Sequence, residues 1–307
     1  MPEFEDIVDK DLILDLIYNI SKVASEEEAY AGEMDYQKIL YLLKKRLSDD
    51  PEINRSLQFY WYLHGPYSTL IADGVQKLVQ NNDLKTTDQS KGKGYVLNDD
   101  YSQRKLNNTI INEFNNIVED YNFFEPRDEI LKNIYSNAPY KFQRYYKFEF
   151  KPLIEEIEDE SSFVLPKNTK RKLMNKMMMA EGKLPKNNKF PKFNQVFSRF
   201  VTLSDTFFEN LETKDHPEGL DHLCDISKEM WSVFCNRLRI LEHDPYYDHQ
   251  VEKWERIYKR SLKTLSNKIE NFDMFISEST ENYKDIEETR SDEDSPWGTV
   301  AKSIISD

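Results

Sequence analysis

Four side chains in the second half of the chain have the chemistry of metal ligands. His216, His222, Cys224 and Cys235 carry the imidazole and thiol groups that zinc prefers in proteins. A zinc site usually contains a close pair such as Cys-x-x-Cys or His-x-x-x-His, and this spacing provides neither. Cys224 and Cys235 instead stand among the apolar residues of a predicted helix. We therefore interpret both thiols as small buried apolar groups, and we predict no metal site and no cofactor.

Catalytic motifs are the next kind of site that a sequence can reveal. The chain lacks a phosphate-binding glycine loop, a nucleophile elbow and a zinc-protease helix. Its 56 Asp and Glu residues are too many for spacing alone to single out an acid–base pair. We therefore predict that the protein is not an enzyme. An enzyme with scattered catalytic residues is the weakest hypothesis, and a deep polar pocket would be its first sign.

Residues 163–199 form a basic segment that has the chemistry to bind phosphate groups. They contain ten basic residues and one acidic residue, in a chain whose net charge is −14. Phe190 and Phe193 stand beside Lys189 and Lys192, a pattern compatible with base stacking. The alternative is an exposed connection that is solvated or docks on the protein's own acidic surface. Together with two lysines of a predicted loop, the nucleic-acid-binding candidates are Lys91, Lys93, Lys170, Arg171, Lys172 and Lys176.

Length and composition limit the class of protein. A chain of 307 residues predicts one large domain or two. Its 18 Phe, 18 Tyr and 4 Trp provide enough bulk for a substantial core. No run approaches the roughly 20 apolar residues that span a bilayer, and the acidic N-terminus lacks the basic start of a signal peptide. We therefore predict a cytoplasmic protein that does not enter a membrane. Its acidity permits a basic protein partner and disfavours wrapping nucleic acid over the whole surface.

Residues 58–68 form the most distinctive stretch of the chain. Phe59, Trp61 and Leu63 alternate with Tyr60, Tyr62 and His64, which predicts a short strand with one buried face. Gly65 and Pro66 predict a turn, and Ser68 predicts the cap of a helix that runs to about Gln80. A strand, a turn and a helix cap give most of these residues a structural role. The alternative interpretation is that they form a surface that binds a partner. The candidates on this surface are Tyr60, Tyr62, His64, Gly65, Pro66, Tyr67 and Ser68.

The elements around this stretch follow a recognisable order. Apolar spacing predicts helices over 10–24 and 35–47 before the strand, and two strands within 84–97 joined by a loop at 90–94 after the helix. This is the element order of a winged helix-turn-helix. The predicted fold class is mainly α, with an N-terminal winged helix-turn-helix-like α+β domain followed by a C-terminal helical bundle.

Four segments make up the predicted domain organisation. Residues 1–160 form the winged-helix domain with a helical extension, and 161–195 form the basic connecting segment. Apolar stripes at helical spacing predict a helical bundle over 196–277. The acidic, polar residues 278–307 predict a disordered tail.

The helix residues Lys38-Ile39-Leu40-Tyr41-Leu42-Leu43, followed by the aromatic strand and Gly65-Pro66, resemble the Panacea, or SocA-like antitoxin, domain and its uncharacterised archaeal and bacterial relatives. The resemblance is good over about residues 35–100 and looser over 5–155. It implies a domain without enzymatic activity that binds and neutralises a partner toxin. The antitoxin pattern usually has a Trp-x-x-Gly-Pro-Val turn, whereas residues 62–67 read Y-L-H-G-P-Y, which is closer to the uncharacterised relatives.

Two hypotheses of function follow. The first is a non-enzymatic, antitoxin-like or phage-defence-associated module that binds and restrains a partner protein. The second is a nucleic-acid-binding transcriptional regulator that uses the loop lysines and residues 163–199. The helix at 67–80, which would read DNA, has Lys77 as its only cation, and residues 1–110 carry 13 basic and 19 acidic residues. This charge favours a protein partner, because DNA readers need cations. The sequence does not indicate which partner is bound, whether a bound nucleic acid would be DNA or RNA, or whether the chain forms homo-oligomers.

Overall fold

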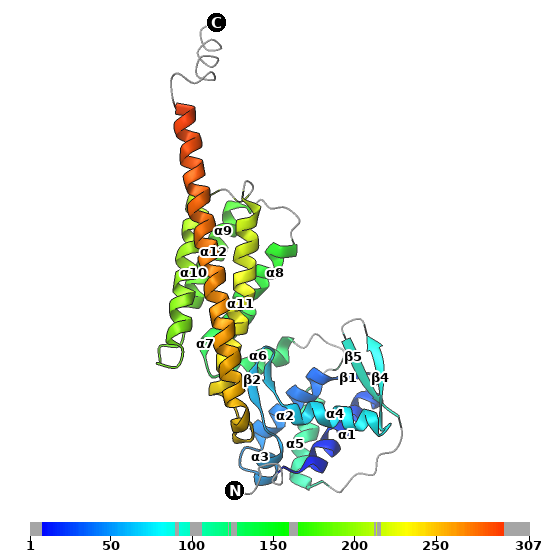
Figure 1. Ribbon diagram of the computed structural model, residues 1–307. Helices are drawn as coiled ribbons and strands as arrows, with labels where there is room; N and C mark the ends of the chain where they lie inside the picture. Colours follow the sequence, from blue (N-terminus) through cyan, green and yellow to red (C-terminus); the bar gives the residue numbers. More distant parts are fainter. Residues whose placement is uncertain are drawn as a thin grey trace. The chain divides into compact units, whose positions relative to one another are not determined.

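The computed structural model describes residues 8–89, 92–98, 106–121, 123, 128–159, 165–211, 213 and 216–291. These residues are mainly helical, with two small antiparallel sheets (Figure 1). The chain divides into two compact units, each built from two separate stretches of sequence. Unit 1 comprises residues 1–139 and 235–256, and unit 2 comprises residues 140–234 and 257–307. Among the described residues, no helix has the length and apolarity to cross a membrane.

Unit 1 contains six α-helices in its described N-terminal stretch. They are α1 (Lys10–Glu26), α2 (Glu33–Arg46), α3 (Pro51–Ser56), α4 (Thr69–Gln80), α5 (Asn108–Glu119) and α6 (Asp128–Ser136). Two begin at Asp residues that accept backbone hydrogen bonds: Asp9 accepts from Leu12 N at 2.9 Å, and Asp50 accepts from Ile53 N at 2.9 Å. Such caps satisfy amide groups that have no partner inside the helix.

The strands of unit 1 form a three-stranded sheet and a separate hairpin. The strands are β1 (Ala31–Gly32), β2 (Tyr60–Tyr62), β3 (Gly65–Tyr67), β4 (Leu84–Gln89) and β5 (Gly92–Leu97). The sheet order is β1-β5-β4, with Ala31 opposite Tyr95 and Leu84 opposite Leu97. The two strands predicted within 84–97 are confirmed, while the loop residues Ser90 and Lys91 lie outside the described residues.

The hairpin differs from its prediction in where it turns. The turn lies at Leu63 and His64, and Gly65–Tyr67 is the return strand β3, which pairs with β2. Gly65 begins this strand with a φ of +96°, a backbone conformation that side chains disfavour. The Gly-Pro pair therefore does not lead directly from the strand into helix α4.

The hairpin is also buried on both faces instead of one. Phe59, Tyr60 and Trp61 are all buried. Tyr60 packs against the rings of Tyr247 and Trp254, each 4.8 Å away between centroids, and Trp61 packs against Tyr135 at 5.5 Å. A segment from far along the chain also pairs with the edge of β2: Trp61 N donates to Glu242 O at 3.0 Å, and Asp244 N donates to Phe59 O at 2.8 Å. The alternating pattern of residues 59–64 could not indicate this cover.

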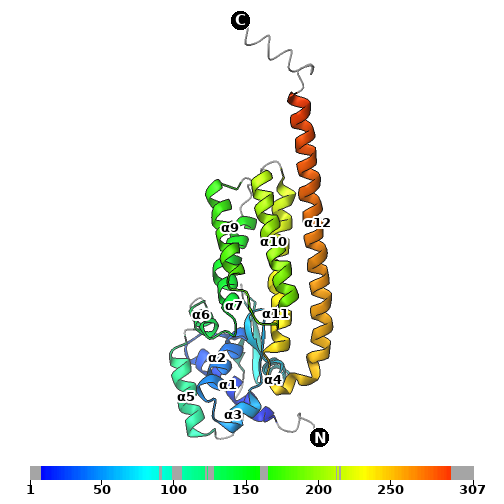
Figure 2. The same ribbon diagram turned by 90° about the vertical axis from the view of Figure 1, so that its left-hand side faces the viewer.

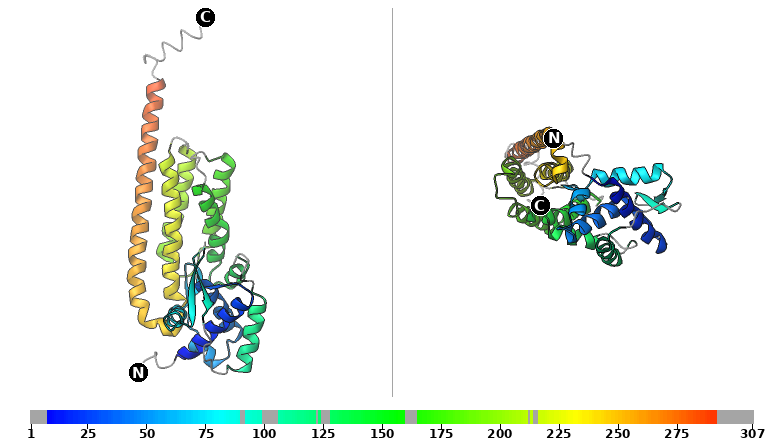
Figure 3. Two further views of the ribbon diagram at one scale, coloured as in Figure 1. Left: turned by 90° about the vertical axis from the view of Figure 1, so that its right-hand side faces the viewer. Right: turned by 90° about the horizontal axis from the view of Figure 1, so that it is seen from below.

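All the secondary-structure elements described in unit 2 are helices. Its elements are α7 (Lys141–Tyr145), the π-helix η2 (Tyr146–Phe150), α8 (Lys151–Asp159), α9 (Lys167–Glu181), α10 (Pro191–Asn210), residues 217–234 of α11 (Pro217–Leu241) and residues 257–291 of α12 (Val251–Ser291). Within the unit, α10, α11 and α12 run side by side (Figure 2, Figure 3). The ends of α11 and α12 that belong to unit 1 are joined by the 3-10 helix η3 (Pro245–Gln250).

An aromatic cluster forms the core of unit 2. The ring of Phe234 lies 4.7 Å from Phe142, 4.8 Å from Phe190 and 5.4 Å from Phe193, measured between centroids. All four rings are fully buried. Phe190 and Phe193 therefore pack in the core and are not available for stacking on bases, which corrects the interpretation of their position beside lysines.

The predicted domain boundaries also need correction. Residues 161–195 were expected to connect two domains, but they contain α9 and the start of α10, because Leu173, Met177 and Ala180 recur at helical spacing and are buried. Residues 278–291 of the predicted tail continue α12, and 292–307 lie outside the described residues. The units are discontinuous because residues 235–256 belong to unit 1.

Candidate functional site

The two halves of the sequence motif, residues 38–43 and 58–68, contact each other directly. Lys38 of α2 is 3 % exposed, and its ammonium donates a hydrogen bond to Pro66 O of β3 at 2.9 Å. The neighbouring Gln37 amide donates to Ser68 O at 2.9 Å and accepts from Ser68 N at 2.7 Å. The side chains of Gln37 and Lys38 thus bond backbone groups of Pro66 and Ser68, as a neighbouring strand would do. The motif residues therefore hold the hairpin against α2.

Ser68 has a different role from the predicted helix cap. It occupies the N-cap position of α4, but its side chain makes no capping bond. Its hydroxyl lies 3.3 Å from the Tyr247 hydroxyl, which accepts from Thr69 N at 3.0 Å and donates to Gln58 O at 3.2 Å. Tyr247 of η3 thus supplies the cap and ties β2 to the start of α4.

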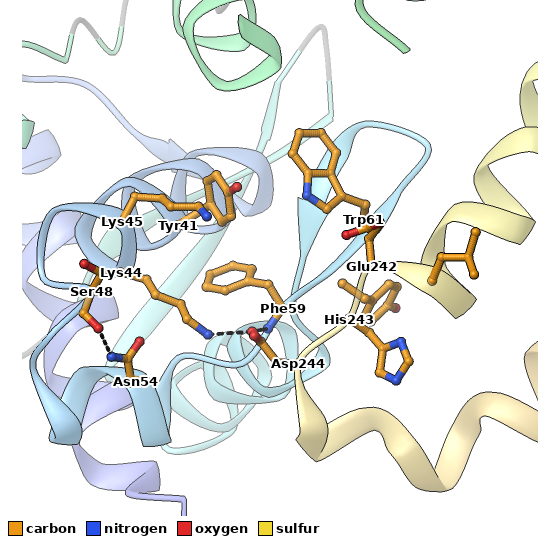
Figure 4. A pocket seen from close by; sticks show the side chains of 12 residues that line it. Tyr41, Lys44, Lys45, Ser48, Asn54, Phe59, Trp61, Glu242, His243 and Asp244 are labelled. Atoms are coloured by element: carbon orange, nitrogen blue, oxygen red, sulfur yellow. Dashed lines mark hydrogen bonds and ion pairs between the residues drawn. The ribbon is translucent and has the colours of Figure 1, made fainter. Parts of the chain in front are cut away.

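A pocket of about 290 Å³ opens beside the hairpin in unit 1 (Figure 4). It lies between the C-terminal part of α2, α3, β2 and residues 241–244. The residues that line it are Tyr41, Lys44, Lys45, Ser48, Asn54, Phe59, Tyr60, Trp61, Leu241, Glu242, His243 and Asp244.

Aromatic rings and one ion pair shape this pocket. Tyr41 packs edge-on against Phe59 and Trp61, with centroid distances of 5.4 and 6.1 Å. Lys44 pairs with Asp244 at 2.5 Å, and the same carboxylate accepts from Phe59 N at 2.6 Å. Two groups that bind Asp244 thus hold the segment 242–244 against β2 (Figure 4).

Lys45 provides a cation at the same pocket. Its side chain is exposed, and its ammonium lies 5.5 Å from the centroid of the Tyr41 ring. Lys44, by contrast, is largely neutralised by Asp244. The pocket therefore offers apolar ring faces beside an exposed positive charge. This arrangement fits an apolar side chain that has a carboxylate next to it.

Burial of Tyr41 predicts a loss of stability at alkaline pH. Burial first, and the Asp244 carboxylate next, raise the pKa of Tyr41 to about 12, from an ordinary value near 10. The phenol ionises in the unfolded chain at a lower pH than in the folded protein, so its contribution is complete below pH 10 and falls as the pH rises toward 12. Urea unfolding at increasing pH should show a falling free energy of unfolding over this range. The free energy of unfolding of Tyr41→Phe should fall less steeply over the same pH range. An equally steep fall would show that ionisation of Tyr41 is not the cause.

The predicted partner-binding residues differ widely in exposure. His64 is exposed at the hairpin turn, and Tyr62 and Tyr67 are half-buried. The ring of Tyr62 faces the Arg239 guanidinium at 4.8 Å, and the Tyr67 hydroxyl donates to Glu33 at 3.0 Å. The other four residues are buried, namely Tyr60, Gly65, Pro66 and Ser68. Among the predicted residues, contact with a partner is thus restricted to three side chains.

The predicted nucleic-acid-binding residues belong to different units. Lys93 is exposed on β5 in unit 1, and Lys91 lies outside the described residues. On α9 of unit 2, Arg171 and Lys172 are exposed, whereas Lys170 and Lys176 are half-buried. Two of these four pair with acids of the same unit, Lys172 with Glu156 at 3.7 Å and Lys176 with Glu149. Internal ion pairs therefore neutralise part of the basic segment.

The sulfur and imidazole groups do not converge. Cys224 and Cys235 are buried, as predicted, and are not joined in a disulfide; burial raises the pKa of the Cys224 thiol to about 12. His222 packs against the Phe275 ring at 5.5 Å. Over the described ranges, no group of three or more His, Cys, Asp or Glu side chains is arranged to hold a metal ion.

Sequence reasoning missed the pocket because its walls are distant in sequence. Lys44 and Asp244 are 200 residues apart, and no local pattern relates them. The one available signal was the aromatic strand itself, which forms one wall. No protein-family model, curated protein or solved structure matches this chain.

Proposed function

We propose that this chain is a non-enzymatic interaction protein that binds and restrains a partner protein, as the resemblance to Panacea domains implies. In this proposal unit 1 is a winged-helix domain. The order α1-β1-α2-α4-β4-β5 and the sheet β1-β5-β4 support that interpretation, with α3 and the β2–β3 hairpin inserted between α2 and α4. Unit 2 serves as an accompanying helical bundle. The setting is a cytoplasmic toxin–antitoxin or antiviral defence system.

The pocket beside the hairpin is the observation that carries this proposal. Protein interfaces concentrate their binding energy in a few anchor side chains that fill such pockets. Tyr41, Phe59 and Trp61 offer ring faces, and Lys45 offers a charge close to them. The partner therefore presents an apolar or aromatic anchor with an Asp or Glu nearby. The exposed His64 and the half-buried Tyr62 and Tyr67 extend the contact along the hairpin.

The surface of α4 supports a protein partner over DNA. Its exposed side chains are Asp73, Gln76, Lys77 and Gln80. One cation, set against one acid, gives little attraction for a phosphate backbone, which dominates the affinity of DNA-binding proteins. The alternative, a nucleic-acid-binding regulator, depends instead on exposed cations such as Lys93 and Arg171, and predicts binding that weakens steeply with salt.

Two matched charge reversals distinguish these functions. Lys45→Glu and Lys77→Glu both change an exposed lysine on a helix of unit 1. We expect Lys45→Glu to weaken partner binding about tenfold, because it places a like charge beside the partner's carboxylate, and Lys77→Glu to leave it unchanged. The measurement is co-purification of a stoichiometric protein from the native host, followed by titration with that protein.

The opposite pattern would support the alternative. Enrichment of DNA or RNA without a stoichiometric protein, together with loss of that enrichment in Lys93→Glu or Arg171→Glu, would overturn the proposed function. Retention of the protein partner by Lys45→Glu at full affinity would place its binding site outside the pocket.

A further inference from the structure

Helix α9 presents an exposed face that combines methionine with cations. Lys167, Arg171, Asn175 and Met178 follow one another at spacings of three and four residues, so they lie on one face, opposite the buried Leu173. Met178 is 59 % exposed and the adjacent Met179 is 52 % exposed. Large apolar side chains that gather on a polar surface often mark an interaction site.

Cations flank the methionine pair in the sequence. Lys167 and Arg171 precede it on the helix, and Lys186 follows shortly after α9 ends. All three are exposed, and none has an ion pair with any residue that the structure describes. Methionine adapts to irregular apolar partners, and the cations favour a negative one. The face therefore fits an acidic segment that also carries apolar side chains.

This chain contains such a segment in its own sequence. Residues 292–307 read D-E-D-S-P-W-G-T-V-A-K-S-I-I-S-D. Three successive acids are followed by Trp297, Val300 and an isoleucine pair. The segment follows directly after residues 257–291 of α12, which belong to the same unit as α9. Sixteen residues span up to about 50 Å when extended, which exceeds the length of about 22 Å that the 15 residues of α9 occupy as a helix.

We propose that residues 292–307 dock on the α9 face of the same molecule, with the acidic triplet on the cations and the apolar residues on Met178 and Met179. The contact covers Lys167 and Arg171 of α9, neither of which has an ion pair with a residue that the structure describes. An external acidic ligand, including nucleic acid, must displace the segment to bind there. This inference concerns unit 2 and does not depend on partner binding at the pocket of unit 1.

Photo-crosslinking in the full chain tests the contact. A benzophenone amino acid replaces Met179, and mass spectrometry maps the crosslinked peptides at low salt. We expect crosslinks within 292–307, and about tenfold fewer when Arg171→Glu and Lys186→Glu are combined. The same probe at the exposed Gln195 of α10 should not give them. Crosslinks that map elsewhere, or that join isotopically light and heavy copies, would overturn the intramolecular contact.

Tryptophan fluorescence gives a second readout without a probe in the face. Trp61, Trp231 and Trp254 are buried, so subtracting the emission of Trp297→Phe isolates Trp297. We expect acrylamide to quench Trp297 several-fold more in Met178→Glu/Met179→Glu than in the unaltered chain. Met274→Glu, a matched change at a methionine of α12 that is 56 % exposed, should leave quenching unchanged. Equal quenching in all three proteins would refute the docking.

Discussion

Phe234→Ala is expected to lower the free energy of unfolding of unit 2 by about 3–5 kcal/mol. The ring lies within 5.4 Å of Phe142, Phe190 and Phe193, all fully buried, so its removal leaves a cavity that rigid neighbours fill poorly. The measurement is hydrogen exchange of the full chain in increasing urea. Amides of α7, α9 and α10 should lose protection at a lower urea concentration.

Phe208→Ala is the matched control for this change. Phe208 is half-buried, and among the described rings it packs against Phe207 at 5.2 Å. Its truncation removes less buried surface, so we expect a cost of about 1 kcal/mol. If both substitutions reduced stability equally, Phe234 would not be the centre of the core.

Periodicity predicted most helices well because burial of one helix face leaves a direct trace in the sequence. The stripe that includes Leu12, Leu16 and Ile20 belongs to α1, and all three residues are buried. Helix α9 has the same kind of stripe in Leu173, Met177 and Ala180, but the surrounding lysines and prolines favoured a connecting segment. That error was avoidable, since lysines on the exposed face of a helix are ordinary.

The hairpin and pocket show where prediction from sequence stops. The strand was found from its aromatic residues, but its second cover comes from residues 242–247. The bonds of Asp244 and Tyr247 to the hairpin join positions nearly 200 apart in sequence. Such contacts are set by how the whole chain packs, so local composition carries no trace of them. The charge of α4, by contrast, follows directly from the sequence. Asp73 and Lys77 are both exposed in the structure, so the argument from that charge still applies.

The residues that carried the family resemblance have a structural explanation. Lys38 is buried and bonded to Pro66 O, and Gln37 pairs with the backbone of Ser68. A pattern of this kind identifies how the hairpin is held, whereas the pocket that could recognise a partner is lined by other residues, such as Lys45 and Glu242. Members of one fold can therefore keep the motif and differ in what they bind.

Gly65→Ala tests that explanation and is expected to destabilise unit 1 by about 1–3 kcal/mol. Gly65 has a φ of +96°, and an added Cβ would lie 3.4 Å from both Lys38 Nζ and the Tyr135 ring. Both neighbours are buried, and 3.4 Å is a close contact without overlap, so the cost arises from the positive φ of Gly65. Urea unfolding followed by hydrogen exchange in α2 and β3 measures the effect.

A second glycine provides the control for backbone strain. Gly182 ends α9 with a φ of −61° and is exposed, and an added Cβ there would meet carbonyl oxygens at ordinary contact distances of 3.6 and 3.7 Å. Gly182→Ala should therefore leave stability within about 0.5 kcal/mol of the unaltered protein. If Gly65→Ala also left the free energy of unfolding unchanged, the positive φ of Gly65 would not be what shapes the hairpin. The presence of Gly65 and Pro66 would then be explained by a role in binding.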